Sequence, residues 1–400
     1  MKKLLLIIPL LILLLQRCSK RDNVVYNINI AEAFQNQQPV FLSKFVSEIL
    51  YVPLKLDTES AISDYPNIII ADYIIIKNSG FYNSTPLMLF AKNNGNFLRF
   101  IGKVGRGPNE YSSVVPDFYN IFNNKLFTYD LTHREIRVLD LEGNIIDRFN
   151  TFDISDPSFS RGIQRASFDT YLNEDTFVSY ISNSTGSVKT KILLFNKDQV
   201  LKTFPNYLRW GDADPKKNNA PYFSPKFYRW NKNLYFKEMF NDTLFQVTTV
   251  NLVPRYVFNL GKNGLSYDQQ NKIMPTFGQL DHSYFLIEDI DENDDFIFFQ
   301  LAYQLKTYTG IFNKKTSETT ICKLTENAAS GLTDDINGFM PLIPRAFTED
   351  NEMVCILSPI DILKWLKDNP DKSEKLKVKL SWLDSITVAS NPVIVFAKCK

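Results

Sequence analysis

The densest group of residues able to do chemistry lies in a glycine-rich segment, Gly102-Lys103-Val104-Gly105-Arg106-Gly107-Pro108-Asn109-Glu110-Tyr111. It is not a Walker loop, because no Gly-Lys-Ser/Thr follows, and the order of its glycines does not fit a dinucleotide fingerprint. Arg106, Glu110 and Tyr111 are expected to give polar contacts to a ligand. The structural alternative is that the glycines and Pro108 fix a turn while Arg106 and Glu110 pair with each other.

Two further places carry candidate binding residues. In residues 204–230, Trp210 and seven other aromatic residues stand among polar residues and four prolines. Exposed rings would stack on sugar rings, with Trp210 as an apolar platform, whereas buried rings would pack beneath a long loop. The segment is longer than a hairpin loop, which makes it a place for variable function. Asp335 is expected to add a second polar contact.

The acidic run 288–295 invites a calcium hypothesis. An EF-hand loop starting at Asp289 needs Gly at position 294 and Glu at position 300, but Asp294 and Gln300 stand there. We interpret the run as a solvated hairpin turn between strands at 284–287 and 296–301. Incidental calcium binding is left open, and no other cofactor or metal site is expected.

The composition restricts the class of protein. The 400 residues contain 45 Lys plus Arg and 44 Asp plus Glu, and a formal net charge of +1 argues against a nucleic-acid binder. An apolar content of 44% excludes disorder, and 32 Phe with 19 Tyr favour β structure. The two histidines, His133 and His282, have no nearby Gly-x-Ser-x-Gly motif. Binding is therefore favoured over catalysis.

These candidates must be positioned by a repeating body. Apolar strands joined by Asn-Gly type turns recur along the chain, which is a hairpin signal. Equivalent apolar residues are separated by 49, 56, 50, 67 and 84 positions; these six pivots are Phe90, Leu139, Phe195, Phe245, Phe312 and Phe396. Further strands between them bring each unit to about four strands. The pattern predicts an all-β fold, a six-bladed β-propeller of four-stranded blades, with a decorated β-sandwich as the alternative.

The two ends of the repeat region predict how the ring closes. The last unit lacks an outer strand, and residues 49–56 can supply it, so that N- and C-terminal strands pair and remove a free sheet edge. The oversized last interval predicts a helical insertion at about 358–386. Ser358 is its expected N-cap, followed by Pro359 at the first helical position. The propeller is expected to cover 48–400.

The N-terminus reads as an export signal. Lys2 and Lys3 precede a twelve-residue apolar run, too short to span a bilayer, so residues 1–17 are expected to be a signal peptide. The run ends before Cys18 in a sequence that resembles the lipobox of bacterial lipoproteins, which implies lipidation of Cys18. An ordinary signal peptide with a chance Cys is the alternative. Residues 18–47 are then a lipidated linker and lead-in, and the mature net charge is −2.

A family resemblance covers about residues 51–400. Residues 105–111, with the Gly-x-Gly-Pro-x-Glu-Tyr pattern, resemble the six-bladed β-propeller lipoproteins common in gut-type Gram-negative bacteria. The segments 333–338 and 391–395 look like that family's Asn-Asp-Ile-x-Gly and terminal Asn-Pro-Val segments, with Thr-Asp in place of the usual polar pair. The resemblance implies the fold and a cell-envelope location.

The expected function is that of a non-catalytic outer-membrane lipoprotein. It would bind a partner protein of the envelope or a glycan-derived ligand at the channel face of the propeller, with membrane attachment through the lipid anchor and no nucleic acid. The periplasmic side is favoured, because no acidic cluster follows Cys18. The alternative is a propeller hydrolase or lyase that acts on sugars or esters with a channel-bound cation, and a third possibility is a structural subunit of an envelope complex.

Overall fold

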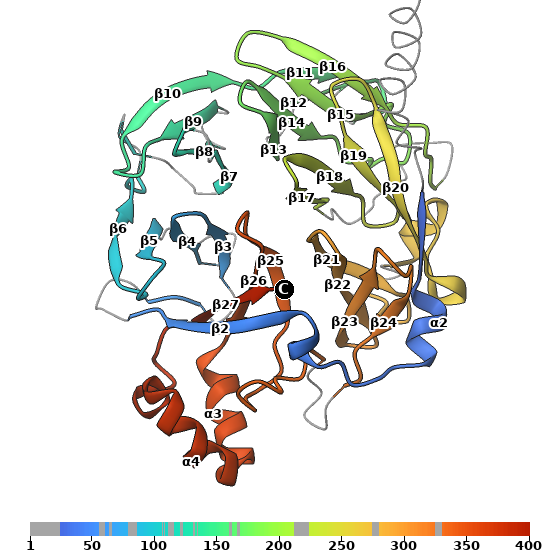
Figure 1. Cartoon of the computed structure of the whole chain (residues 1–400). Helices are drawn as coiled ribbons and strands as arrows, with labels where there is room; N and C mark the ends of the chain where they lie inside the picture. The colour runs from blue at the N-terminus through green and yellow to red at the C-terminus, as the bar shows by residue number, and fades with distance from the viewer. Residues whose placement is uncertain are drawn as a thin grey trace, which may run out of the picture.

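The computed structural model describes residues 25–400 apart from 56–60, 64, 65, 79–85, 106, 108, 111–115, 121, 122, 131, 132, 134, 160, 161, 166–168, 212–223, 274–279 and 325–329. Six antiparallel sheets stand around a ring (Figure 1), and strands that follow one another in sequence are neighbours within each sheet. This arrangement confirms the all-β, six-bladed propeller of four-stranded blades.

The blades are numbered 1 to 6 in chain order. Their strands are β3 (Asn67–Ile70), β4 (Tyr73–Lys77), β5 (Leu87–Ala91) and β6 (Phe97–Ile101) in blade 1; β7 (Pro116–Asn120), β8 (Lys125–Asp130), β9 (Glu135–Leu139) and β10 (Ile145–Asn150) in blade 2; β13 (Thr170–Asn173), β14 (Thr176–Tyr180), β15 (Thr190–Phe195) and β16 (Val200–Pro205) in blade 3; β17 (Lys226–Trp230), β18 (Asn233–Lys237), β19 (Thr243–Val247) and β20 (Leu252–Asn259) in blade 4; β21 (Leu286–Glu292), β22 (Phe296–Tyr303), β23 (Lys306–Asn313) and β24 (Thr319–Ile321) in blade 5; and β25 (Pro344–Phe347), β26 (Glu352–Leu357), β27 (Val393–Cys399) and β2 (Val46–Pro53) in blade 6. A two-stranded ribbon, β11 (Asp153–Ser155) with β12 (Ile163–Arg165), lies between blades 2 and 3.

The core consists of apolar layers between neighbouring blades. Each of the six expected pivots lies in the third strand of its blade, and five of them are buried, while Phe245 is half-buried. Leu139 packs against blade 1, and Phe195 packs against blade 2. Middle strands have a blade on both sides, so β14 and β15 are buried at every position rather than at every second one.

The ring closes as the sequence predicts. β2 pairs antiparallel with β27, from Val46 opposite Cys399 to Pro53 opposite Val393, and so becomes the outer strand of blade 6. This pairing satisfies the backbone groups of both strands and leaves no unpaired edge on β27.

Residues 26–45, here called the strap, run along the outside of blades 4 and 5 before β2 begins (Figure 1). β1 (Tyr26–Asn29) adds a fifth strand to blade 4, parallel to β20. Helix α2 (Ile30–Gln35) follows, and Gln38 then forms a parallel bridge to Cys322 at the end of blade 5. The short 3₁₀ helix η1 (Leu42–Lys44) leads into β2.

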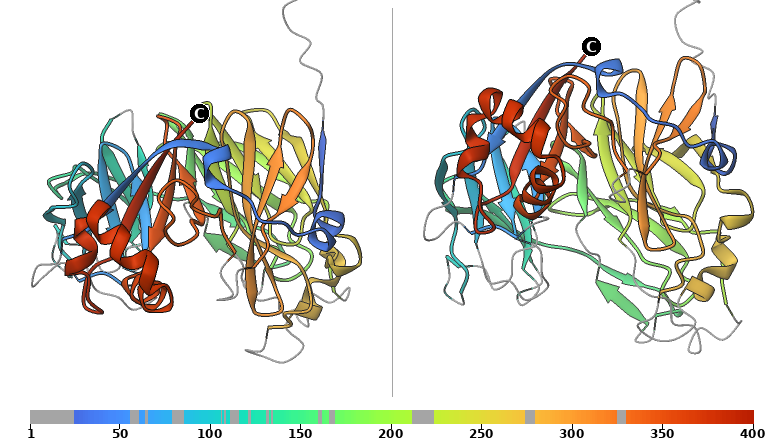
Figure 2. Two further views of the ribbon diagram at one scale, coloured as in Figure 1. Left: turned by 60° about the horizontal axis from the view of Figure 1, so that its bottom comes forward. Right: turned by 90° about the horizontal axis from the view of Figure 1, so that it is seen from below.

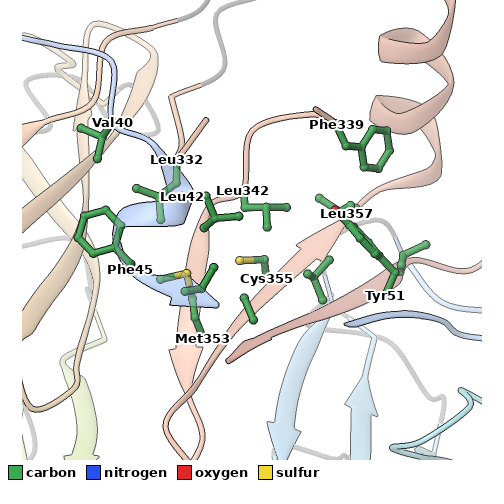
Figure 3. Close-up of a cluster of buried hydrophobic side chains, with 14 of the residues drawn as sticks. Val40, Leu42, Phe45, Tyr51, Leu332, Phe339, Leu342, Met353, Cys355 and Leu357 are labelled. Carbon is green, nitrogen blue, oxygen red and sulfur yellow. The ribbon is translucent and has the colours of Figure 1, made fainter. Parts of the chain in front are cut away.

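The strap contributes side chains to two of the interblade cores. Ile28 and Ile30, both fully buried, join the core between blades 4 and 5. Val40, Leu42 and Phe45 join the core between blades 5 and 6, where Figure 3 shows them beside Leu332, Leu342 and Met353. Burial of one such side chain contributes about 1.5–3 kcal/mol. The strap is therefore part of the folded body.

Glycine in two turns lets one blade approach the outer strand of the blade before it. Gly95, between β5 and β6, has φ +68°, and a Cβ there would lie 2.1 Å from the Pro53 carbonyl oxygen of blade 6. Gly143, between β9 and β10, has φ +91°, and a Cβ would lie 2.0 Å from the Gly102 nitrogen of blade 1. Both turns need glycine for two reasons: a Cβ would clash with the neighbouring backbone, and a positive φ is unfavourable for other residues.

The helical insertion lies between β26 and β27, and it appears beside the ring in both views of Figure 2. α3 (Pro359–Asp368) begins at Ser358, whose side chain accepts a hydrogen bond from the backbone N–H of Ile360, as expected for an N-cap. α4 (Pro370–Lys379) and the 3₁₀ helix η5 (Ser381–Ser385) complete it. No helix in the described ranges has the length and apolar character needed to cross a membrane.

Candidate functional site on the connection face

Strand direction places the candidate residues on one face of the ring. Within a blade the strands alternate in direction, so the connections between blades open on the same face as the loops between second and third strands. We call this the connection face. It comprises the described residues within the ranges 54–66, 78–86, 102–115, 131–134, 151–169, 181–189, 206–225, 238–242, 260–285, 304–305, 322–343 and 358–392.

The glycine-rich segment folds around Glu110. The Glu110 carboxylate accepts a hydrogen bond from the Gly107 N–H at 2.9 Å. A Cβ at residue 105 would lie 2.0 Å from a Glu110 carboxylate oxygen, and one at residue 107 would lie 3.1 Å from it. The Gly-x-Gly-x-x-Glu pattern therefore has a physical cause: the two glycines leave room for the carboxylate to fold back on its own loop.

Arg137 connects this loop to blade 2. Its guanidinium donates from NH1 to the Glu110 carbonyl oxygen and from Nε to Glu135 Oε1 at 2.8 Å, and its NH2 forms an ion pair with Asp130 Oδ2 at 3.1 Å. Arg137 is 2% exposed and the Asp130 side chain is fully buried. Charged hydrogen bonds of this kind, shielded from water, fix both the loop and the start of β9.

His133 completes this group. Its backbone N–H donates to Asp130 Oδ1 at 2.9 Å, and its Nδ1 lies 2.9 Å from Arg137 NH2 and 3.2 Å from Asp130 Oδ1. The side chain is 48% exposed. The site thus combines buried charged side chains, Arg137 and Asp130, with an imidazole that reaches solvent. We call Glu110, Asp130, His133, Glu135 and Arg137 the blade-2 cluster.

A second polar group lies at the same face between blades 3 and 4. The Glu238 carboxylate accepts hydrogen bonds from Tyr180 at 2.7 Å and from Tyr267 at 3.1 Å, and it pairs with Lys191. The side chains of Lys191 and Glu238 are 7% and 6% exposed. Burial and the Glu238 charge raise the pKa of Tyr267, so it stays a hydrogen-bond donor. The group binds two blades and a connection together.

Lys237 lies next to this group and is buried. Its ammonium donates to the Glu238 carbonyl oxygen at 3.0 Å and lies 5.5 Å from the centre of the Phe258 ring. Desolvation lowers the pKa of Lys237 to about 8, although the charges of Asp242 and Glu238 oppose the shift. The positive charge of Lys237 at neutral pH thus has a cost in stability.

The structure places the predicted site residues on different connections. Glu110 lies between blades 1 and 2, Trp210 between blades 3 and 4, and Asp335 between blades 5 and 6. Arg106 and Tyr111 lie outside the described residues, so the predicted Arg106–Glu110 pair does too. Cys18 also falls outside them.

Trp210 is 3% exposed, and its indole N–H donates to the Asn183 carbonyl oxygen at 2.7 Å. This placement agrees with the alternative in which rings of residues 204–230 pack beneath the loop, while Tyr207 of the same segment is 84% exposed. Asp335 is exposed, and its carboxylate accepts hydrogen bonds from the backbone N–H and the hydroxyl of Ser43 in the strap. Ligand binding by these residues stays a prediction.

The acidic run differs from its interpretation as a solvated turn. β21 extends to Glu292, so only residues 293–295 form the turn. Asp289 pairs with Lys226 of blade 4 at 3.3 Å, and Asp291 accepts the Phe347 N–H of blade 6 at 2.8 Å. These carboxylates connect blades, which periodicity alone could not show. Within the described residues, no three His, Cys, Asp or Glu side chains gather as possible metal ligands.

Sequence reasoning missed the role of Arg137. The available signal was a charge inside an otherwise apolar strand, Ile136-Arg137-Val138-Leu139, because a buried guanidinium requires carboxylate or carbonyl partners. Its partner Asp130 ends the preceding strand, and Glu110 stands 27 residues earlier. The sequence contains the charge but does not identify its partners.

Comparisons with known proteins support the fold. A family model described as "Domain of unknown function (DUF4934)" matches residues 25–398. No curated protein matches the chain. A solved structure described as a "Putative exported protein" of Bacteroides fragilis is 16% identical, with a TM-score of 0.60, and the match covers 94% of this chain and all of that one.

A member of the DUF4221 family from Bacteroides vulgatus is 11% identical, with a TM-score of 0.52. That match covers 89% of this chain and 97% of the other. At these identities the likeness concerns the fold alone.

Proposed function

The chain belongs to the DUF4934 family, and we propose that it is a non-catalytic, lipid-anchored envelope protein that binds a partner protein or a glycan-derived ligand at the connection face. The observation that carries this proposal is the blade-2 cluster. Buried Arg137 holds the glycine-rich loop against blade 2 while His133 reaches solvent. Polar groups fixed before the ligand arrives lose little entropy on binding, which favours recognition.

The anchor is proposed from Cys18. Seven residues, 19–25, separate Cys18 from the strap, and an extended chain of that length spans about 25 Å. The tether would hold the edge of blade 4 near the outer membrane, on the periplasmic side. The description of the Bacteroides fragilis neighbour as an exported protein is consistent with an envelope location.

Binding is tested by capture from native membranes together with a glycan array, using the full-length protein in detergent. We expect Glu110→Ala to lower the affinity for the captured ligand at least fivefold, because the carboxylate orders the glycine-rich loop. Glu142→Ala is the matched control, since Glu142 is exposed and lies in the β9–β10 turn, outside the connection face. Equal affinities for both variants and the parent protein would refute the site.

Anchoring is tested with Cys18→Ser. We expect the parent protein to sediment with membranes and to incorporate a labelled fatty acid, and the variant to do neither. Incorporation of the label by the variant would exclude Cys18 as the lipidated residue.

A further inference from the structure

The imidazole of His133 is held in one proton arrangement by its buried neighbours. Arg137 has donors only, and its NH2 lies 2.9 Å from His133 Nδ1. In the neutral ring this shorter contact favours Nδ1 as the acceptor, which places the proton on Nε2. In the other neutral tautomer Nδ1–H would face the guanidinium and would depend on the longer contact to Asp130 Oδ1, at 3.2 Å.

Protonation does not change what the ring presents to solvent. In the cation, Nδ1–H can donate to Asp130 Oδ1, which lies 3.2 Å away, and Nε2 keeps its proton. Because Nδ1 faces the buried groups, the exposed part of the ring is the part that carries Nε2. His133 therefore offers a hydrogen-bond donor in both charge states.

Glu135 provides an acceptor that contacts the same guanidinium as His133. Its Oε1 takes the Arg137 Nε–H at 2.8 Å, and its side chain is 21% exposed. In the described part of the chain no residue donates to its Oε2. The blade-2 cluster thus holds one N–H donor and one carboxylate acceptor on partly exposed side chains that both contact Arg137.

The charge of the cluster limits the kind of ligand. Among its members, Glu110, Asp130 and Glu135 are negative and only Arg137 is permanently positive. The excess of carboxylates opposes an anionic ligand. Hydroxyl groups suit such a cluster, because a hydroxyl can accept from His133 Nε2–H and can also donate to a Glu135 carboxylate oxygen.

We infer that the blade-2 cluster binds a neutral, hydroxyl-bearing ligand of the sugar class, with His133 as donor and Glu135 as acceptor. The inference rests on the proposed function. Of the two ligand classes named there, it favours the glycan-derived ligand over the partner protein. It also assigns His133 to binding, as a donor through Nε2–H.

The proton arrangement is tested first, by histidine ring ¹⁵N NMR on the full-length protein labelled at histidine. The chain has two histidines, so a spectrum of His282→Phe assigns both. We expect neutral His133 to be the Nε2–H tautomer, and an Nδ1–H tautomer would overturn the donor role.

Binding is then measured to neutral and to uronate-containing oligosaccharides on one array, at pH 5.5 and pH 8. We expect neutral oligosaccharides to bind with less than threefold change between the two pH values. His133→Gln, which keeps an N–H donor, is expected to stay within about threefold, and His133→Phe to lose at least tenfold. His282→Phe, on the connection between blades 4 and 5, is the matched control and is expected to bind like the parent protein.

The outcomes separate this inference from the proposed function. Binding of uronate-containing oligosaccharides alone, or of a membrane protein sensitive to His133→Phe, would overturn the neutral-sugar ligand and keep the connection face as the binding site. A neutral oligosaccharide that binds equally to His133→Phe and the parent protein would overturn the assignment of His133. If no oligosaccharide binds, and Glu110→Ala captures the same membrane ligand with the affinity of the parent protein, both the neutral-sugar inference and the proposed function are overturned.

Discussion

The interfaces on either side of blade 5 are built differently from those between blades 1, 2 and 3. Between blades 5 and 6, strap residues, the helical insertion and both blades share one core. Between blades 1 and 2 the described core residues come from the two blades alone: Ile75, Leu87, Leu89, Ile101, Leu126 and Leu139. Two of the six interfaces are thus reinforced by the strap, a segment distant in sequence, whereas the interface between blades 1 and 2 is held by chain neighbours.

The candidate site lies away from the interfaces that the strap stabilises. The blade-2 cluster lies in the part of the ring that the strap does not touch, and its charges hold a loop rather than a blade edge. The buried Glu292 of blade 5, in contrast, joins Tyr228, Tyr256 and Lys314 beneath the strapped interface. Five substitutions test how far the strapped and the unstrapped parts of the ring differ.

The largest effect is expected from Lys314→Met. Lys314 pairs with the fully buried carboxylate of Glu292, and removal of the cation leaves an uncompensated buried charge, which costs about 3–5 kcal/mol. Urea unfolding measures this loss. Addition of Glu292→Gln is expected to restore part of it. Lys315→Met, at a side chain that is 73% exposed, is the control and is expected to change stability by less than about 0.5 kcal/mol.

Truncation of apolar side chains compares the two kinds of interface. Leu42 of the strap and Leu139 of blade 2 are both 0% exposed, so Leu42→Ala and Leu139→Ala are each expected to cost about 2–4 kcal/mol. Only Leu42→Ala should speed hydrogen exchange at the Lys323 amide, which donates to Gln38 of the strap. Equal acceleration by both variants would mean that the strap and blade 2 open as one unit.

The pH dependence of Lys237 has a defined sign. Its folded-state pKa, about 8, is below its ordinary 10.5, so between these values the unfolded chain binds more protons and stability rises with pH. Lys237→Met is expected to stabilise the protein by about 2–3 kcal/mol at pH 7, and the difference should shrink towards pH 10.5. Thermal unfolding of both proteins from pH 7 to 10.5 measures it. A gain that is independent of pH would exclude the lysine charge as its cause.

The smallest effect is expected at Asp335. Its carboxylate accepts two hydrogen bonds from Ser43 and so links the strap to the connection between blades 5 and 6. Desolvation alone would raise the pKa of Asp335, but the hydrogen bonds from Ser43 together outweigh it, so the pKa is lowered. Asp335→Ala is expected to cost about 0.5–1 kcal/mol near neutral pH. Because the folded pKa is lowered, this contribution is lost as pH falls through it, so parent and variant should converge at low pH. A difference in free energy of unfolding that stays constant down to pH 2 would show that the Asp335 carboxylate does not stabilise the strap through Ser43.

Local patterns explain why the blades were predictable. Alternating apolar residues and Asn-Gly turns specify each hairpin, and the missing outer strand of blade 6 pointed to residues 49–56. The strap was not predictable as an added edge. Its Tyr-Asn-Ile-Asn run alternates as a strand does, but its partner β20 stands about 230 residues later, and nothing local identifies it.

The candidate site was predictable only in part, for a related reason. The glycines at 105 and 107 indicated a constrained loop around Glu110, and the structure shows the constraint. Burial of Trp210 depends on Asn183 and Gly186 of another loop. An aromatic residue in a sequence does not show which segment covers it.

The long separation between the strap and β20 has a consequence for the order of folding. The strap and β2 leave the ribosome first, yet β20 and β27, which pair with them, are made late and last. Contacts this distant in sequence slow folding, since a long chain loop must close before they form. During synthesis β1 therefore stays unpaired until β20 is made, and β2 stays unpaired until β27 of blade 6 is made. A chain that ends before β27 would leave β2 unpaired as an open edge. The ring can therefore close only after synthesis has reached β27.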